Sequence, residues 1–203
     1  DPTDGGESDR SSLSYDVRKP FLGGHFQMGA YWIKYRLQLF SNFTYFQDDR
    51  VNGDQFEQYD SRTVTGISPN WLWTGTLGGV ESAIKVGLKL RRDNIDRVGL
   101  YSTLARQRLS TTREDTVRET AGGIYAENTQ QWTEKFRSVL GLRADFYHMD
   151  VASNLAANSG NRNDHLATPK LNLIFGPWNS TEYFVSAGDG FHSNDARGTV
   201  ISV

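Results

Sequence analysis

The sequence of 203 residues lacks cysteine and lacks any long apolar run. A chain without cysteine forms neither disulfides nor thiolate metal sites. A membrane-spanning helix needs roughly 18 or more consecutive apolar residues, and no segment approaches that length. These absences exclude a disulfide-stabilised domain and a helical membrane protein. They leave a transmembrane β-barrel open, because each barrel strand has only one apolar face.

The chain also lacks a strong excess of charge of one sign. It carries 22 basic and 24 acidic residues, for a net charge of −2, so it shows no sign of binding nucleic acid. Histidine is scarce, and His25, His148 and His165 are scattered along the chain. We therefore expect no nucleic-acid partner, no metal site and no cofactor.

What the sequence has instead is glycine, aromatic residues and a regular alternation of apolar with polar residues. Its 20 glycines and 12% aromatic content fit a β-rich chain. The alternation has a period of two, which is the period of a strand with two different faces. The alternating segments are Tyr35–Tyr45, Ile84–Leu90, Phe136–Phe146, Leu171–Phe175 and Tyr183–Ala187. They predict an all-β fold, an antiparallel meander of about 8–9 strands.

The links between these segments are short and long in turn. Short links are expected at Thr74–Gly79, Asn128–Trp132 and Gly176–Ser180. Long polar links are expected at Gln47–Tyr59, Arg106–Arg118 and Val151–His165. Tight turns at one end and long loops at the other are typical of outer-membrane barrels. The pattern therefore predicts a wall of a transmembrane β-barrel.

This arrangement of links requires Val80–Ala105 to cross the membrane once. The polar stretch RRDNIDR interrupts the segment, but the apolar parity of Ile84–Leu90 resumes at Val98 and Leu100. One long strand with a bulged polar centre fits this parity. A hairpin at Asp93–Asp96 is the alternative, because such polar residues commonly form turns.

Aromatic residues recur near the expected strand ends. They are Tyr31, Trp32, Trp71, Trp73, Trp132 and Trp178. Membrane barrels place such aromatics at both interfaces. A soluble β-sandwich or lipocalin-like barrel also alternates and remains the alternative, but it would place its polar residues outside and its apolar residues inside.

The polar faces of the expected strands are mainly basic. With the apolar faces assigned to lipid, the basic residues facing the lumen are Arg36, Lys85, Lys89, Arg91, Lys135, Arg137, Arg143 and Lys170. The acidic residues assigned to the same face are Asp145 and Glu182. Such a wall would attract an anionic ligand or an acidic domain inside the barrel. The alternative is that these cations pair with acids on strands outside this chain.

The stretch FHSNDARG at Phe191–Gly198 has the composition of a hydrolase active site. His192 and Ser193, however, are neighbours that point to opposite sides of an extended strand, which is poor geometry for a nucleophile and its base. We expect no enzyme activity. A hydrogen-bond network at the barrel rim is predicted instead for His192, Asn194, Asp195 and Arg197.

A second polar stretch, DDRVNGDQFEQYD, is rich in acids. They are Asp48, Asp49, Asp54, Glu57 and Asp60. The stretch lacks the ligand spacing and flanking helices of a calcium-binding EF-hand. A solvated acidic loop is expected, with weak divalent-cation contact as the alternative.

Several longer segments resemble the β-barrel domain of TonB-dependent outer-membrane receptors. They are LFSNFTYF, NGDQFEQYDSR, IYAENTQQWTEKFRSVLGLRADFY, TPKLNLIFGPWNSTEYF and GDGFHSNDARG. The combination of a polar turn, Trp-Thr, a charged strand start and GLRxDxY with PKLNLIFGPW and FHSNDARG is specific. The resemblance covers nearly the whole chain.

The resemblance implies a location in the bacterial outer membrane and TonB-dependent uptake of a scarce nutrient, such as a ferric siderophore. Receptors of this type close about 22 strands around a plug, so residues 1–203 are expected to be an internal part of the barrel domain, without the plug that engages TonB. The implied partners are the TonB system, outer-membrane lipid and lipopolysaccharide, and an extracellular ligand. The alternative is an independent small outer-membrane barrel with a structural or enzymatic role.

Overall fold

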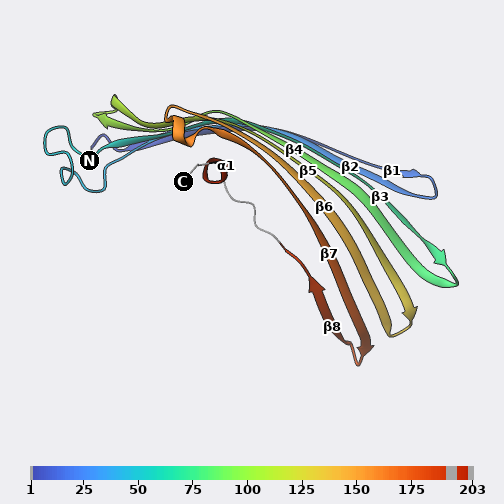
Figure 1. The fold of residues 1–203 in the computed structure, drawn as a ribbon. Helices are drawn as coiled ribbons and strands as arrows, with labels where there is room; N and C mark the ends of the chain where they lie inside the picture. The colour runs from blue at the N-terminus through green and yellow to red at the C-terminus, as the bar shows by residue number, and fades with distance from the viewer. Residues whose placement is uncertain (1, 191–195, 201–203) are drawn as a thin grey trace.

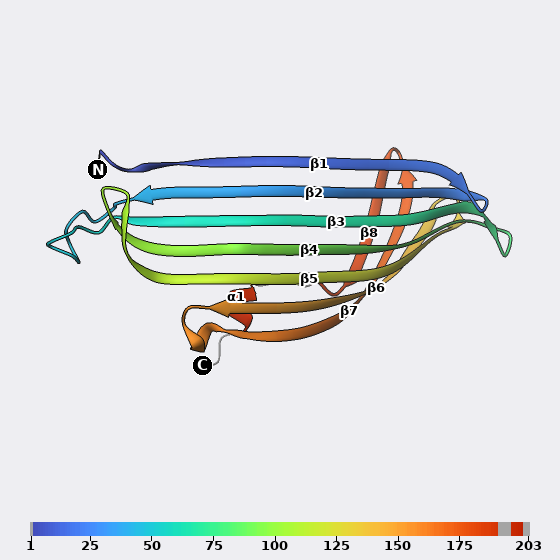
Figure 2. The same cartoon turned by 90° about the horizontal axis from the view of Figure 1, so that it is seen from above.

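The computed structural model describes residues 2–190 and 196–200 of the chain. Eight strands form one antiparallel sheet in which each strand pairs with its neighbours in sequence, in the order β1 to β8 (Figure 2). The strands are β1 Gly5–Phe21, β2 Gly24–Ser41, β3 Phe56–Leu77, β4 Val80–Leu104, β5 Gln107–Thr133, β6 Phe136–Ser153, β7 Gly160–Trp178 and β8 Thr181–Gly188. The helices are η1 Ala156–Asn158 and α1 Ala196–Thr199. The predicted all-β meander is confirmed.

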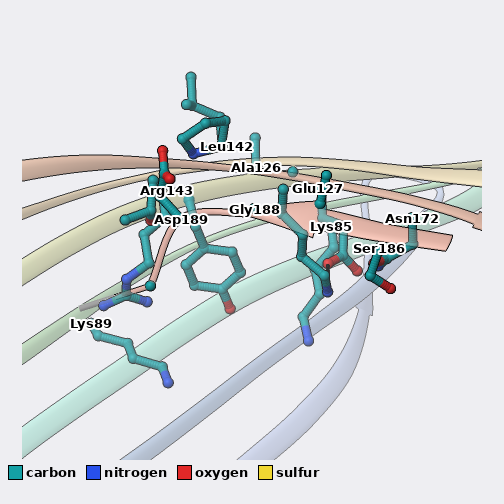
Figure 3. Close-up of a pocket in the computed structure, with 17 residues that line it drawn as sticks. Lys85, Lys89, Ala126, Glu127, Leu142, Arg143, Asn172, Ser186, Gly188 and Asp189 are labelled. Atoms are coloured by element: carbon teal, nitrogen blue, oxygen red, sulfur yellow. Dashed lines mark hydrogen bonds and ion pairs between the residues drawn. The ribbon is translucent and has the colours of Figure 1, made fainter. Parts of the chain in front are cut away.

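The sheet is a single curved layer, and α1 lies on its concave side (Figure 1). The strand registers show which residues share a face, because side chains alternate along each strand. One row across β3 to β7 reads Trp71, Val86, Ala126, Leu142 and Pro169. In Figure 3, Leu142 and Ala126 extend to one side of the sheet, and Lys89 and Arg143 extend to the other. We call the face of Leu142 the convex face and the face of Arg143 the concave face.

The convex face carries an apolar band that explains why these segments form strands. On β6 the convex residues from Leu140 to Phe146 are apolar, with His148 next in line. The ten residue-to-residue steps from Ser138 to His148 span about 34 Å along a strand, or about 24 Å when the strand is tilted by about 45°. That height matches the apolar belt of a membrane barrel, about 25 Å. Large apolar side chains are exposed along this band, and Leu142 is 59% exposed.

The strands meet in tight turns at one end, which we call the short-turn end. The turn residues Leu22, Asn179 and Ser180 have positive φ angles, as do the glycines Gly78 and Gly79. The short links predicted near residues 74–79 and 176–180 are confirmed. The third prediction was displaced, because β5 continues to Thr133 before it turns. The prediction that Trp71 lies near this end is confirmed, and its Nε1 donates to the Phe21 carbonyl oxygen at 2.9 Å.

The opposite end, which we call the outer end, has fewer loops than the sequence suggested. Residues 42–55 form the expected loop between β2 and β3. The prediction of a long link at Arg106–Arg118 was wrong, because only Ala105 and Arg106 separate β4 from β5. Likewise, only residues 154–159 separate β6 from β7. These strands extend beyond the apolar band, where both faces meet water and polarity no longer distinguishes strand from loop.

Strand β4 passes once through the sheet, as predicted, but Val98 and Leu100 do not share the face of Ile84–Leu90: they pair with concave residues of β3 and β5. Its pairing with β3 shifts register beside Ser61 and Arg62, and its pairing with β5 shifts between Ile95 and Val98. The shift is a β-bulge within the stretch RRDNIDR, which bends a strand without ending it. The alternative hairpin at Asp93–Asp96 is therefore excluded.

The buried apolar core is small because the sheet is one layer thick. Its cluster consists of Val117, Met149 and Val151 of the sheet and Ala196 of α1. The Thr199 hydroxyl donates to the Met149 sulfur at 3.2 Å, which also holds α1 on the sheet. No helix in the described part of the chain is long and apolar enough to cross a membrane.

The loop of residues 42–55 is organised by a carboxylate. Asp54 accepts the backbone N–H groups of Gln47 at 2.8 Å and of Asp49 at 2.7 Å. Asp49 in turn accepts the N–H groups of Val51 and Asn52. These acids have a structural role, and no group of three or more metal-ligating side chains occurs within the described ranges. Glu57, which was predicted to belong to this loop, lies in β3.

We expect Asp54→Asn to loosen this loop. The N–H of Asp49 lowers the pKa of the Asp54 carboxyl below its ordinary value of 3.8. Because the folded pKa is the lower one, the stabilisation is complete above pH 3.8 and is lost as the pH falls through the folded value. The protection factors of the Asp48 and Asp49 amides, which compare each amide with an unstructured peptide at the same pH, should fall as the pH drops below 3.8 in the native protein and should be low at all pH values in the variant. Asp48→Asn is the control, and equal protection in all three proteins would refute the role of Asp54.

Candidate functional site

The concave face is hollowed where β4 to β8 approach the short-turn end (Figure 3). The hollow has a volume of about 710 Å³, within the usual range of ligand sites, about 300–1,000 Å³. Its charged lining consists of Lys85, Lys89, Arg143 and Lys170 with Glu127 and Asp189. We call this site the basic hollow. It brings together four predicted basic residues of the lumen wall.

The lysines of the basic hollow differ in their partners. Lys170 Nζ lies 3.4 Å from Glu127 Oε2, across one intervening strand. Lys85 lies beside Glu127 in the pairing of β4 with β5, but no ion pair forms between them. Neither Lys85 nor Lys89 has an ion pair with any described residue. These two ammonium groups are therefore available to an anion.

Arg143 is held in place by a residue of its own strand. Its Nε donates to Asp145 Oδ2 at 2.6 Å. Gly123 makes room for the pair, because a Cβ there would lie 2.6 Å from an atom of each partner. A guanidinium fixed in this way keeps donors free on its other edge, so Arg143 can contribute to an anion site without moving.

The same type of pair occurs on four adjacent strands. Its members are Asp60 and Arg62 on β3, Arg91 and Asp93 on β4, Arg113 and Asp115 on β5, and Arg143 and Asp145 on β6. We call these the in-strand pairs. Their carboxylates are buried, with side-chain exposures of 13% or less.

The prediction of a strongly basic wall therefore overestimated the net positive charge of the concave face. It counted only Asp145 and Glu182 on the concave face and missed the other acids of the in-strand pairs and Glu127. Arg137 also has a partner, because its two terminal nitrogens lie 2.7 and 2.9 Å from the Glu182 carboxylate. Among the predicted basic residues that lie on the concave face of a strand, Lys85 and Lys89 are those without an ion pair to a described residue.

Arg36 lies on the convex face, which contradicts its assignment to the lumen. In the register of β2 with β3, Arg36 has the parity of Phe26, whose partner is Trp71. Arg36 pairs there with Asp9 at 3.1 Å and Glu7 at 3.5 Å. Tyr35, the first residue of the alternating segment that suggested the opposite, lines a concave hollow together with Ile33. In this part of β2 the apolar side chains are on the concave face, so the assumption that the apolar face meets lipid fails for Arg36.

The rim network predicted in FHSNDARG is only partly described. His192, Asn194 and Asp195 lie outside the described residues. Arg197 lies in α1 and lines a second concave hollow with Asp60 and Asp115. The predicted faces of β8 are confirmed up to Ala187, since Glu182 meets Arg137 on the concave face and Ser186 lines the basic hollow.

Several polar residues that line the basic hollow were not predicted as site residues, and some of them are neither acidic nor basic and can donate hydrogen bonds. They include Tyr125, Asn172 and Ser186. Tyr125 belongs to β5 and shares its parity with Glu127, but the sequence around it is rich in small residues and gives weak alternation. The pairing of Lys85 with Glu127 places Tyr125 in the hollow, and that pairing is not visible in the sequence.

Comparisons with known proteins agree on one family. The family model described as "TonB dependent receptor-like, beta-barrel" matches residues 1–200. A search among curated proteins found no sequence match. The chain therefore belongs to the TonB-dependent receptor β-barrel family, whose members are bacterial outer-membrane proteins.

Solved structures of similar fold are themselves receptors. The unliganded ferric citrate transporter FecA aligns with a TM-score of 0.68 at 16% identity, over 90% of this chain and 27% of FecA. The closed form of the ferric-catecholate import receptor Fiu from E. coli K12 gives 0.72 at 11% identity, over 91% of this chain and 33% of Fiu. The ferric yersiniabactin uptake receptor FyuA from Yersinia pestis gives 0.53 at 14% identity, over 83% of this chain and 25% of FyuA. The chain thus spans about a third or less of the length of these proteins.

Proposed function

We propose that this chain forms part of the wall of a TonB-dependent receptor that takes up an anionic nutrient, such as a ferric siderophore. The short-turn end then faces the periplasm and the outer end faces the medium. In this proposal the rest of the barrel and a plug belong to the same receptor, and the plug contacts TonB. The wall binds and admits the ligand and has no enzymatic role.

The observation that supports an anionic ligand is the pair of free lysines in the basic hollow. Lys85 and Lys89 lie on one strand, four residues apart, so their Cα atoms are separated by about 13 Å. A carboxylate- or phenolate-bearing chelate is wide enough to meet both. The nearby Arg143 and the hydroxyl groups of Tyr125 and Ser186 add hydrogen-bond donors.

Growth under iron limitation tests this proposal. A strain lacking the complete receptor gene is supplied with ferric siderophores of different charge, and vitamin B12 and a glycan serve as neutral alternatives. We expect loss of growth on one or a few anionic chelates and rescue by the intact gene. If the intact gene were needed only for growth on a neutral nutrient, the ligand would not be anionic. If growth on the ligand did not depend on TonB, the proposed uptake mechanism would be wrong.

A further inference from the structure

The convex face of β4, β5 and β6 carries a second hollow, of about 500 Å³. The convex side chains that line it on these strands are Val86, Leu88, Ile124, Ala126, Leu142 and Ala144, all apolar, and the hollow continues over β2 and β3 at Phe26, Pro69 and Trp71. The small side chains of Ala126 and Ala144 leave space between the larger ones. A dry groove of this kind, at membrane height, suits a hydrocarbon chain.

The rows above this groove become polar in an ordered way. The strand registers place Leu88 beside Ile124 and Ala144, then Leu90 beside Gly122 and Phe146. The next row contains Arg92, Thr120 and His148, and the row after it contains Asn94, Arg118 and Asp150. Successive rows are about 7 Å apart along the strands. The cations therefore begin directly where the apolar band ends.

Gly122 keeps a path open between the groove and the cations. It lies on the convex face between Leu90 and Phe146, which are 49% and 56% exposed. A Cβ at this position would meet only the Leu90 Cδ2 atom, at 3.3 Å. A side chain larger than alanine would close the gap between the two flanking residues.

The cations above the gap differ from those of the concave face. Arg92 and Arg118 are exposed, and neither forms an ion pair with a described residue. Arg92 Nε donates to Asn94 Oδ1 at 3.2 Å, which leaves its terminal nitrogens free. His148 Nδ1 lies 2.7 Å from Asn163 Oδ1. Asp150 is the acid that faces this group, and Lys34 lies in the row of Arg118.

We propose that this surface is a binding site for a phosphate-bearing lipid of the outer leaflet. One acyl chain occupies the apolar groove, and the phosphate lies between Arg92 and Arg118. Guanidinium groups bind phosphate oxygens in bidentate fashion, and basic groups at the edge of a membrane attract anionic head groups. The proposal requires that the convex face meets lipid, as the family implies, but it does not require any particular transported ligand.

Native mass spectrometry of the complete receptor in detergent tests the site. The probes are bisphosphorylated lipid A and the same lipid with its phosphates removed. We expect the native receptor to bind the phosphorylated form at least tenfold more tightly. Arg92→Gln with Arg118→Gln should abolish this preference, and Gly122→Leu should weaken binding of both lipids by blocking the groove. Arg18→Gln, which removes an exposed cation from the concave face of β1, is the matched control and should bind as the native protein does.

Three results would overturn the proposal. Equal binding of the two lipids by the native receptor would show that the phosphate is not recognised. Full displacement of the lipid by millimolar inorganic phosphate would identify a site for the free anion. A receptor dimer that the Arg92→Gln and Arg118→Gln substitutions dissociate would show that this face binds a second copy. Heat-modified mobility on a gel confirms that each variant is folded before it is compared.

Discussion

Replacing both Lys85 and Lys89 with glutamine is expected to weaken binding of the anionic ligand by roughly 100-fold. Each lysine supplies a charged contact worth about 1.5 kcal/mol or more, which is about tenfold in affinity. Neither ammonium group forms an ion pair with a described residue, so both can contact the ligand. Binding to the complete receptor, measured by calorimetry at low and high salt, gives the dissociation constant directly. The native protein should lose affinity as salt is added, and the double variant should be nearly insensitive to it.

The matched control is Lys34→Gln, which removes the same charge from the convex face. It should leave ligand affinity unchanged, and a neutral chelate should bind all three proteins alike. Unchanged affinity of the double variant for an anionic chelate would refute the role of the basic hollow. Calorimetry measures ligand binding and the growth experiment measures uptake, so a negative result in one can be distinguished from a negative result in the other.

Leu142→Arg is expected to destabilise the barrel by about 2–4 kcal/mol. Leu142 lies in the middle of the convex apolar band and is 59% exposed on that face. An arginine there would place its guanidinium in hydrocarbon, far from either interface. Reversible unfolding of the complete barrel in lipid vesicles measures the change in free energy of unfolding.

Asn172→Arg, on the opposite face of the neighbouring strand, is the control for this experiment. Asn172 lines the basic hollow, where water hydrates a new charge at a cost below about 1 kcal/mol. Similar losses for the two variants would mean that the convex face does not meet lipid. A loss at Asn172 alone would show that the two faces are reversed.

Parity along single strands predicted most of the fold. For β4 the predicted single strand is correct, but the bulge between Ile95 and Val98 moves the later apolar residues to the concave face, so their shared parity in the sequence did not mean a shared face. The same reasoning failed for Arg36, because Ile33 and Tyr35 are apolar and yet line a concave hollow. Alternation distinguishes two faces, but only pairing with neighbouring strands shows which of them meets lipid.

Only part of the basic hollow was predicted, because alternation identifies residues of one strand but not their neighbours on the next strand. Lys85, Lys89 and Arg143 have the polar parity of their strands and were assigned correctly to one face. Tyr125 was missed because its position depends on the register between β4 and β5. β1 was not predicted, although Leu13, Tyr15 and Val17 alternate with Ser14, Asp16 and Arg18, because this alternation covers only part of the strand and the residues before it are polar on both faces. The acids of the in-strand pairs were visible in the sequence two residues from each arginine, and this spacing was the signal that could have revealed them.

The in-strand pairs also bear on how such a wall assembles. In each pair the arginine and the aspartate are two residues apart on one strand, so the carboxylate has its counter-charge before any neighbouring strand arrives. The pairs Arg137–Glu182 and Lys170–Glu127 instead join different strands and form only when β7 and β8 are in place. The counter-charge of each of these carboxylates is therefore local to its own strand, and we expect the pair to form in a strand before the next strand is added.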